Sequence, residues 1–332
     1  MVYTLTLNPS LDISSRMSRL VFDDINRIEK KQLDPGGKGI NVSRMLAVLG
    51  VETLPIAFYG GYAGKQSLEL LSKGGISKVH PIIIQDETRT IHNFFFDDGT
   101  PPLRINEPGP SIRLSERKAL EDFLKKLPSQ KDDWLVCSGS LPPGVPSSFY
   151  GTLIRNMRRI HPSLSVALDS DGIFLSKGVK GRPTLLKPNL WELSRLVENP
   201  LSSWELLVSA VKRLLTKGTE FLLLSLGEKG AIGFSQSEIV WWVPPRLKVL
   251  STVGCGDVFM AGFLHAIGKK SDFSEAVRFA VSCGTAKAAV DGTGLPTRSS
   301  IRKIRESTRL ISSSQISLKG EALLRPLRFE RE

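Results

Sequence analysis

The chain has 332 residues, of which 41% are hydrophobic, and a formal net charge of +12. No apolar run approaches the roughly 18 residues that a membrane-spanning helix needs, so we expect a soluble protein with no membrane partner. The positive charge comes without a recognisable nucleic-acid-binding module, so we expect a solvated basic surface or an anionic small substrate, and no nucleic-acid partner.

The first residues, MVYTLTLNPSLD, lack the basic region and the apolar core of a secretory signal, and they predict a strand. The cysteines Cys137, Cys255 and Cys283 lie far apart and form no C-x-x-C pair, which indicates neither a disulfide framework nor a zinc site. We therefore expect a cytoplasmic protein.

Short runs of β-forming apolar residues alternate with helical patterns along the chain. The expected strands are residues 2–7, 134–138, 165–169, 185–186 and 221–226. A helix is expected over residues 42–49, where apolar residues repeat at helical spacing, with Gly50 as its C-cap. This alternation predicts an α/β fold whose mainly parallel sheet is covered by helices on both faces. Such sheets bind ligands beyond the carboxyl ends of their strands.

Two early segments interrupt the alternation. Residues 10–35 and 85–107 have the pattern of extended chain, and the second contains a turn at residues 97–99 between β-rich flanks. We expect them to form a small β-layer apart from the main sheet. The main domain is expected to span residues 1–310, followed by a basic tail, residues 311–332, that is loosely ordered.

The stretch STVGCGDVFMAGF, residues 251–263, places two glycines and an aspartate where a helix begins. Gly254 and Gly256 permit a tight turn, so that the backbone N–H groups of residues 254–257 can converge on an anion. The positive end of the helix dipole favours a phosphoryl group at this point. On this stretch alone, Asp257 is explained equally well as a catalytic base or as an acid that stabilises the helix start.

Further motifs follow expected strands or begin expected helices. They are LNPSLD (7–12), DPGGKGINVSRMLAVLG (34–50), CSGSLPPGVP (137–146), KPNLWEL (187–193), SLGEKGA (225–231) and DGTG (291–294). A P-loop at residues 60–67 is rejected, because its glycine spacing is one residue short and Gln66 stands where serine or threonine must bind magnesium.

In this order, over about residues 1–300, the motifs resemble the PfkB family of carbohydrate kinases and in particular its phosphosugar branch. The resemblance implies a ribokinase-like three-layer sandwich with a small β lid, and a homodimer formed through that lid. It implies that ATP, with Mg²⁺, phosphorylates a ketohexose phosphate, with fructose 1-phosphate to fructose 1,6-bisphosphate as the first choice. A tagatose-6-phosphate or fructose-6-phosphate 1-kinase is the alternative, and a non-catalytic sugar-phosphate sensor on the same fold is the alternative of another class.

The resemblance also implies roles for single residues. Asp257 matches the general base, and Gly254, Cys255 and Gly256 match the anion hole beside it. The matches to sugar-phosphate-binding positions are Asp12, Gly37, Lys38, Asn41, Arg89 and Ser138. The matches to nucleotide-binding positions are Lys187, Ser225, Gly227, Gly230 and Gly292.

Two assignments remain open on the sequence. Asn189 and Glu192 match a pair that organises magnesium through water, but the same N-x-x-E pattern is a helix capping box. Cys255 stands where the family usually has alanine or serine. It is either a small buried residue of which only the N–H is used, or a reactive thiol whose pKa is lowered by the helix start.

Overall fold

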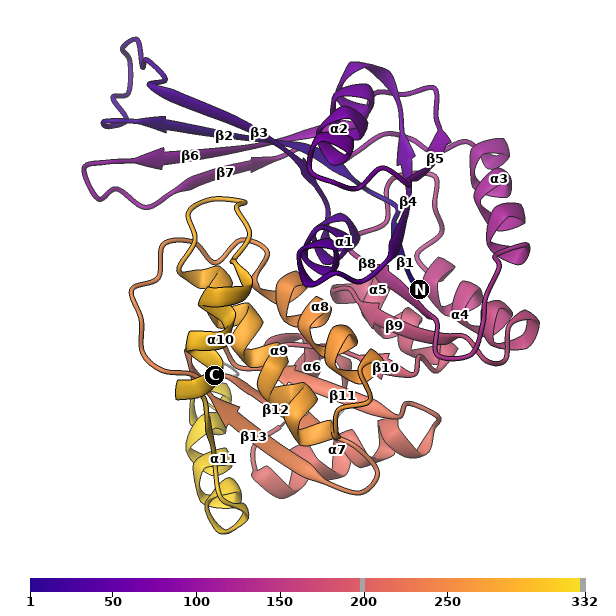
Figure 1. Ribbon diagram of the computed structural model, residues 1–332, viewed down its shortest axis with the longest axis vertical. Helices are drawn as coiled ribbons and strands as arrows, with labels where there is room; N and C mark the ends of the chain where they lie inside the picture. The colour runs from indigo at the N-terminus through magenta and orange to yellow at the C-terminus, as the bar shows by residue number, and fades with distance from the viewer. Residues whose placement is uncertain (198–200, 329–332) are drawn as a thin grey trace.

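The computed structural model describes residues 1–197 and 201–328 (Figure 1). The strands of its main sheet are β1 (Val2–Thr6), β4 (Thr53–Tyr59), β5 (His80–Ile83), β8 (Trp134–Ser138), β9 (Ser165–Asp169), β10 (Leu185–Leu186), β11 (Phe221–Ser225), β12 (Ala231–Phe234), β13 (Ile239–Val243) and β14 (Arg309–Leu310). Their order is β14-β13-β12-β11-β10-β9-β8-β1-β4-β5. Every pairing from β5 to β11 is parallel, and those from β11 to β14 are antiparallel. The predicted α/β class with a mainly parallel sheet is confirmed.

Helices cover both faces of this sheet. They are α1 (Lys38–Leu49), α2 (Gly61–Lys73), α3 (Leu114–Lys125), α4 (Phe149–Ile160), α5 (Gly172–Gly178), α6 (Leu190–Leu196), α7 (Trp204–Thr216), α8 (Cys255–Gly268), α9 (Phe273–Ala288), α10 (Arg298–Ser307) and α11 (Ser313–Arg328). The α1 prediction is confirmed, since Met45 and Leu46 are fully buried and Gly50 caps the helix with a φ of 78°. In the described parts of the chain no helix is long and apolar enough to cross a membrane.

The hydrophobic core consists of two large clusters on opposite faces of the sheet. One contains apolar residues of α3 to α7 and α11, and the other contains those of α1, α8, α9 and α10. Because side chains alternate along a strand, neighbouring residues enter different clusters. Leu222 and Leu224 of β11 pack in the first, and Leu223 in the second. The site described below lies at the carboxyl edge of these doubly covered strands.

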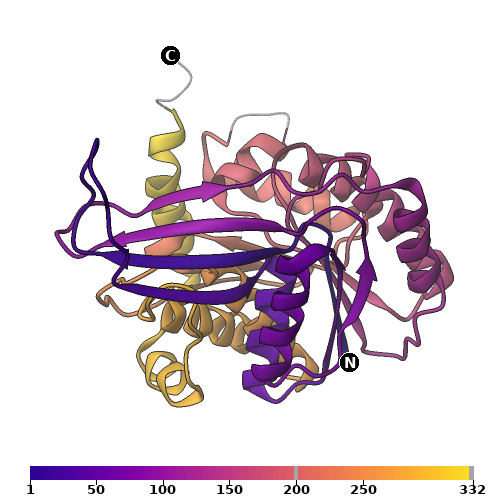
Figure 2. The same ribbon diagram turned by 90° about the horizontal axis from the view of Figure 1, so that it is seen from above.

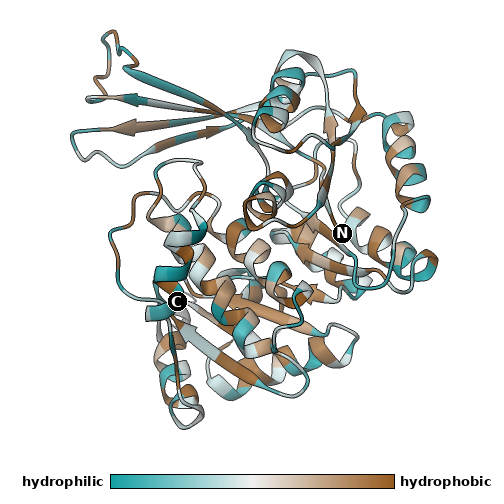
Figure 3. Cartoon of the chain, in the orientation of Figure 1, coloured by the Kyte–Doolittle hydropathy of each residue, from teal (hydrophilic) through white to brown (hydrophobic). Residues whose placement is uncertain are grey.

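A smaller, separate sheet is formed by the two extended segments. Its strands β2 (Ser10–Met17), β3 (Lys30–Gly36), β6 (Arg89–Phe96) and β7 (Leu103–Asn106) have the order β3-β2-β6-β7. It projects from the body at the upper left of Figure 1, and Figure 2 shows its strands side by side. Figure 3 shows apolar residues along β6 and β7, and Ile105 is half exposed. Since β2 follows β1 after three residues, the sheet begins at the carboxyl end of β1.

The expectation of a loosely ordered tail is wrong for residues 313–328. They form α11, with Ile316, Leu323 and Leu324 buried in the first core cluster. Spacings of seven and eight residues place these three side chains on one helix face, which packs against the body. Residues 329–332 lie outside the described residues. The preceding strand β14 pairs with β13, so the segment after residue 308 continues the main fold.

Candidate functional site

Asp257 lies in the first turn of α8, where the carboxyl ends of the central strands meet the helix start. Its side chain is buried, and its Oδ2 accepts a hydrogen bond from Asn41 Nδ2 of α1 at 2.8 Å. Gly254, the residue before α8, has a φ of 75°. A Cβ there would lie 3.7 Å from Lys287 Cε and 3.9 Å from Asp257 Oδ2. Glycine therefore permits the turn and leaves space beside the carboxylate.

The surroundings of Asp257 make it a stronger base than a free aspartate. Burial, together with the negative charge of Asp169, raises the pKa of Asp257 to about 6. The Lys38 charge and the Asn41 hydrogen bond act in the opposite direction without cancelling the rise. A carboxylate with this pKa is largely ionised at neutral pH and is still able to accept a proton from a positioned hydroxyl group.

Asp169, the last residue of β9, connects two lysines beside Asp257. Its Oδ1 lies 3.0 Å from Lys38 Nζ and its Oδ2 lies 3.2 Å from Lys187 Nζ. Asp169 is 1% exposed, yet the two ammonium groups outweigh the effect of burial and lower the pKa of its carboxyl. Burial lowers the pKa of Lys38, but Asp169 and Asp257 raise it above its usual value. The result is two fixed positive charges close to the α8 start, where a Cβ on Gly256 would be 3.4 Å from Lys187 Nζ.

Two charged residues near Asp257, Asp169 and Lys287, were not predicted from the sequence. Asp169 was predicted only as the end of a strand. Lys287, near the end of α9, is 1% exposed, and its Nζ donates a hydrogen bond to the Gly292 carbonyl at 2.8 Å. An acidic residue at the carboxyl end of a buried strand, and a lysine within an apolar helix pattern, are the signals that could have identified them.

The expected sugar-phosphate residues lie on β2 and β6 of the small sheet, at the start of α1 and at the end of β8. Asp12 of β2 accepts a hydrogen bond from Ser10 Oγ at 2.6 Å. Arg89, which begins β6, donates to the main-chain oxygens of Asn8 at 2.9 Å and Glu107 at 3.1 Å. Burial raises the pKa of Asp12 to about 6, although Ser10 and Arg89 lower it. The arrangement offers a buried carboxyl next to a guanidinium, with Lys38 and Asn41 on the adjoining helix.

Polar atoms without partners lie between these elements. Ser138 Oγ, Thr6 Oγ1 and Asn8 Oδ1 are buried and accept or donate no hydrogen bond within the described residues. A Cβ on Gly39 would lie 2.5 Å from Thr6 Oγ1 and 3.0 Å from Ser138 Oγ, so α1 begins in close contact with both hydroxyls. Gly37, with a φ of 119°, makes the turn before it. Buried polar atoms usually have hydrogen-bond partners, so these three unpartnered atoms indicate a binding site for a polar ligand.

A cavity of about 1000 Å³ opens on the other side of the α8 start. Ser225, Gly227 and Gly230 line it, as do Cys255 and Gly256. Gly230 has a φ of 81°, and a Cβ on it would lie 2.0 Å from the Trp242 carbonyl, so only glycine fits this turn. The cavity therefore joins the glycine turn after β11 to the start of α8.

Two expected nucleotide residues do not line this cavity. Lys187 contacts Asp169, as described above. Gly292 lies in a loop that is tied to the small sheet, because Asp291 pairs with Arg16 at 2.7 Å and Thr293 donates a hydrogen bond to Asp34. The structure therefore places the residues 291–294 against the small sheet and the Lys287 ammonium group.

Asn189 and Glu192 form the capping box that was one of the two alternatives. Glu192 N donates to Asn189 Oδ1, and Asn189 N donates to Glu192 Oε2, both at 2.8 Å. Across the described ranges no cluster of three or more histidine, cysteine or acidic residues could bind a metal directly. The second oxygen of Glu192 takes no part in the cap, and the Glu192 charge acts on Lys38. This donor set fits Mg²⁺ bound through water.

Cys255 does not have the properties of a reactive thiol. Burial raises the pKa of its thiol, and Asp257 adds to the rise, while Lys287 opposes it. Its Sγ lies 3.7 Å from the Ser251 carbonyl oxygen. The alternative of a lowered pKa is not supported, because burial and the Asp257 charge outweigh the opposing effect of Lys287. Cys255 is a small residue at the helix start, but it is only partly buried and lines the large cavity.

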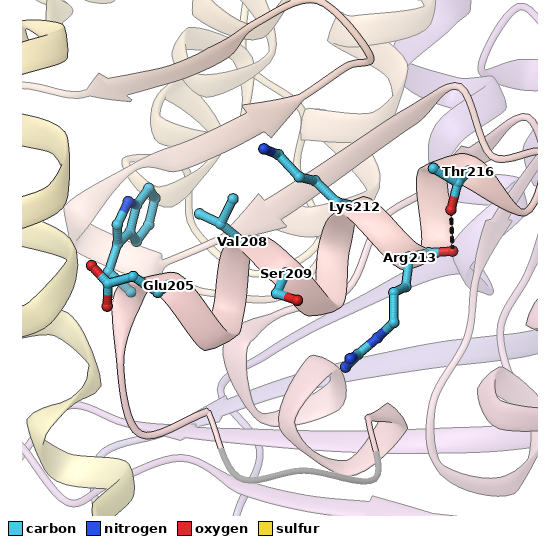
Figure 4. Close-up of a pocket in the computed structure, with 7 residues that line it drawn as sticks. Glu205, Val208, Ser209, Lys212, Arg213 and Thr216 are labelled. Carbon is cyan, nitrogen blue, oxygen red and sulfur yellow. Dashed lines mark hydrogen bonds between the residues drawn. The ribbon is translucent and has the colours of Figure 1, made fainter.

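A second pocket, of about 530 Å³, is lined by residues of α7 alone. Figure 4 shows its lining side chains spaced along α7, among them Glu205, Lys212 and Arg213. It contains no glycine turn and none of the expected site residues. The large cavity at the start of α8 is therefore the candidate for chemistry.

Known proteins resemble this chain over most of its length. The model of the pfkB family carbohydrate kinases matches residues 5–299. The 1-phosphofructokinase of Bacillus subtilis (strain 168) is 32% identical over 294 residues, which cover 89% of this chain and 94% of that enzyme.

Solved structures agree with the family match. Phosphofructokinase-2 from Escherichia coli, solved with potassium, has a TM-score of 0.85 and 31% identity over 92% of this chain and 98% of its own. The same enzyme has been solved in a tetrameric inhibited form. Ribokinase of Arabidopsis thaliana, 22% identical over 92% of this chain and 98% of its own, has a TM-score of 0.69 and shows the ribokinase-like fold. The chain therefore belongs to the PfkB family of carbohydrate kinases and is a phosphotransferase.

Proposed function

We propose that this protein is a sugar-phosphate kinase that transfers the γ-phosphoryl group of ATP to a ketohexose phosphate. Our first choice of reaction is fructose 1-phosphate to fructose 1,6-bisphosphate. The observation that carries the proposal is the position of Asp257. Its carboxylate accepts a hydrogen bond from Asn41, its neighbours Cys255 and Gly256 line the large cavity, and the charges of the Lys38–Asp169–Lys187 cluster act on it.

In the proposed reaction, Asp257 accepts the proton of the attacking sugar hydroxyl. Phosphoryl transfer passes through a loose transition state, so the protein mainly aligns the two reactants and stabilises spreading charge. The N–H groups at the start of α8 and the Lys187 ammonium group stabilise this charge. Mg²⁺ bound near Glu192 through water would neutralise part of the phosphate charge. The small sheet covers the sugar and excludes water, which prevents ATP hydrolysis.

Arg89 is proposed to bind the phosphate already present on the sugar. We expect Arg89→Ala to raise KM for fructose 1-phosphate by about 10- to 100-fold, because a charge-assisted hydrogen bond contributes about 1.5 to 3 kcal/mol. KM for ATP should change by less than about threefold. Arg104→Ala is the matched control, since Arg104 is an exposed arginine of the same sheet, in β7. Equal changes for both substrates would contradict the assignment.

The raised pKa of Asp257 predicts how the rate depends on pH. The base must be ionised, so kcat/KM should fall as the pH decreases through about 6, the pKa of Asp257 in the free protein. Asp12, with a pKa also raised to about 6, steepens the fall if its carboxylate binds the sugar. Measurement of kcat/KM from pH 5 to pH 8 tests this. A profile that stays flat down to pH 5 is the contrary result.

Side-by-side kinetics test the function itself. Fructose 1-phosphate, fructose 6-phosphate, tagatose 6-phosphate and fructose are compared as acceptors with ATP. Fastest turnover of fructose 1-phosphate is expected, and the fructose-6-phosphate and tagatose-6-phosphate 1-kinase alternatives predict another order. A non-catalytic sensor would bind a sugar phosphate without consuming ATP. Preference for unphosphorylated fructose would refute the phosphosugar assignment.

We also propose a homodimer formed through the small sheet, and a cytoplasmic location. Exposed apolar side chains on and near this sheet support the first, among them Phe22, Ile25, Leu103 and Ile105. The three cysteines are free, which agrees with a reducing compartment.

A further inference from the structure

Helix α11 lies beside the large cavity. It follows residue 299, where the match to the family model ends. Lys319, Ala322 and Leu323 of α11 line the cavity, and Ile311 before the helix lines it too. Figure 1 shows α11 beside β13 at the edge of the main sheet. This segment therefore adds a wall to the cavity from outside the matched part of the chain.

The position of α11 is fixed by specific contacts. Ile311 N donates to the Trp241 carbonyl at 2.9 Å, which places the chain at the sheet edge just before the helix. Glu321 Oε1 accepts a hydrogen bond from Trp204 N, in the first turn of α7, at 2.6 Å. A Cβ on Gly320 would lie 2.3 Å from the Trp204 ring, so a glycine lets the two helices approach closely. Leu324 is fully buried at the same interface.

The other walls of the cavity are formed by residues at and near the start of α8. They include the glycine turn after β11, Cys255 and Gly256 of α8, and Gly284 and Ala288 of α9. A ligand whose phosphates reach the start of α8 extends from there along these walls. The α11 side chains Ala322 and Lys319 are both exposed and line the same cavity.

We propose that α11 is a nucleotide-binding wall of this protein, with Ala322 contacting the nucleoside and Lys319 attracting the polyphosphate charge. The proposal rests on the proposed kinase function. Ala322 is small, so it leaves space for a ligand next to the apolar Leu323. Lys319 places a positive charge at the rim, where it increases the local concentration of an anionic nucleotide.

Filling the cavity from α11 tests the wall directly. We expect Ala322→Trp to raise both KM for ATP and the Kd of a non-hydrolysable ATP analogue by at least about tenfold, since a large side chain cannot be accommodated together with the ligand. KM for the phosphosugar should stay within about twofold. Leu318→Trp is the matched control, because Leu318 is 76% exposed on α11 and does not line the cavity.

Lys319→Ala tests the charge without adding bulk. It should raise KM for ATP by about two- to fivefold at low salt, and the difference from the wild type should vanish at about 0.5 M salt, where such charges are screened. Lys303→Ala, an exposed lysine of α10 that does not line the cavity, should have no effect. Thermal melting of each variant shows whether it is folded.

The results separate the wall from the kinase function. If Ala322→Trp and Lys319→Ala bind the analogue as the wild type does, the α11 proposal is overturned and the kinase function stands. If the wild type neither binds the analogue nor turns over ATP, both are overturned. Equal weakening by Leu318→Trp would also overturn the wall, because the effect would then not depend on the cavity.

Discussion

Asp257→Asn should lower kcat by about 10²- to 10⁴-fold and leave the Kd for ATP within about threefold, the range for loss of a general base. Asparagine keeps the size of the side chain and an oxygen that can accept the hydrogen bond from Asn41. It cannot take the proton from the sugar hydroxyl. Single-turnover rates and equilibrium nucleotide binding measure the two quantities separately.

The same variant provides its own control for folding. The pKa of Asp257 is raised from 3.8 to about 6 in the folded protein, so its contribution to stability is present below pH 3.8 and is lost as the pH rises through about 6. At pH 8 the asparagine variant should therefore be at least as stable as the wild type, by up to about 3 kcal/mol. An inactive variant that melts earlier would indicate a damaged fold. Ordinary turnover would mean that Asp257 only stabilises the helix start.

Asp169→Asn should lower the free energy of unfolding by about 3 to 5 kcal/mol, because it leaves the buried Lys187 ammonium group without its carboxylate partner. Lys187 is only 5% exposed and lies 3.2 Å from Asp169 Oδ2, so water cannot replace the lost charge freely. The pKa of Asp169 is lowered in the folded protein, so its stabilisation is present above the ordinary pKa of aspartate and is lost as the pH falls through the lowered value. Urea unfolding at pH 7 measures the effect.

An exposed pair gives the comparison for Asp169. Glu52 and Lys78 form an ion pair at 3.1 Å, but their side chains are 59% and 75% exposed. Glu52→Gln should change the free energy of unfolding by less than about 1 kcal/mol, since water screens such pairs. A loss for Asp169→Asn no larger than that for Glu52→Gln would show that the buried cluster does not stabilise the fold.

The sequence predicts those elements whose formation depends on residues that are close together in the chain. The spacing of Met45, Leu46 and Leu49 with Gly50 is sufficient for α1, because burial of one face and a left-handed cap are both local properties. The capping box of Asn189 and Glu192 is local in the same way. The order of the parallel strands is not, since β1 lies between β4 and β8 and no short stretch records that.

The missed parts of the site depend on contacts between distant residues. Lys38 and Asp169 are separated by 131 positions and meet only because β9 ends and α1 begins at the same edge of the sheet. For Cys255, the helix start predicts a lower pKa and burial predicts a higher one, and the sequence gives no measure of burial. Helix α11 was not predicted, because the surface on which its apolar residues pack, around Trp204, lies more than a hundred residues earlier in the chain.

The large cavity crosses from one layer of the molecule to the other. Phe259 and Val281, on α8 and α9, belong to the core cluster on one face of the main sheet, and Leu323 on α11 belongs to the cluster on the opposite face. A ligand in this cavity touches both layers at once, so neither can separate from the sheet without releasing it. At a concentration 100 times its Kd such a ligand adds about 2.7 kcal/mol to the free energy of unfolding. Its binding therefore stabilises both hydrophobic layers together against unfolding.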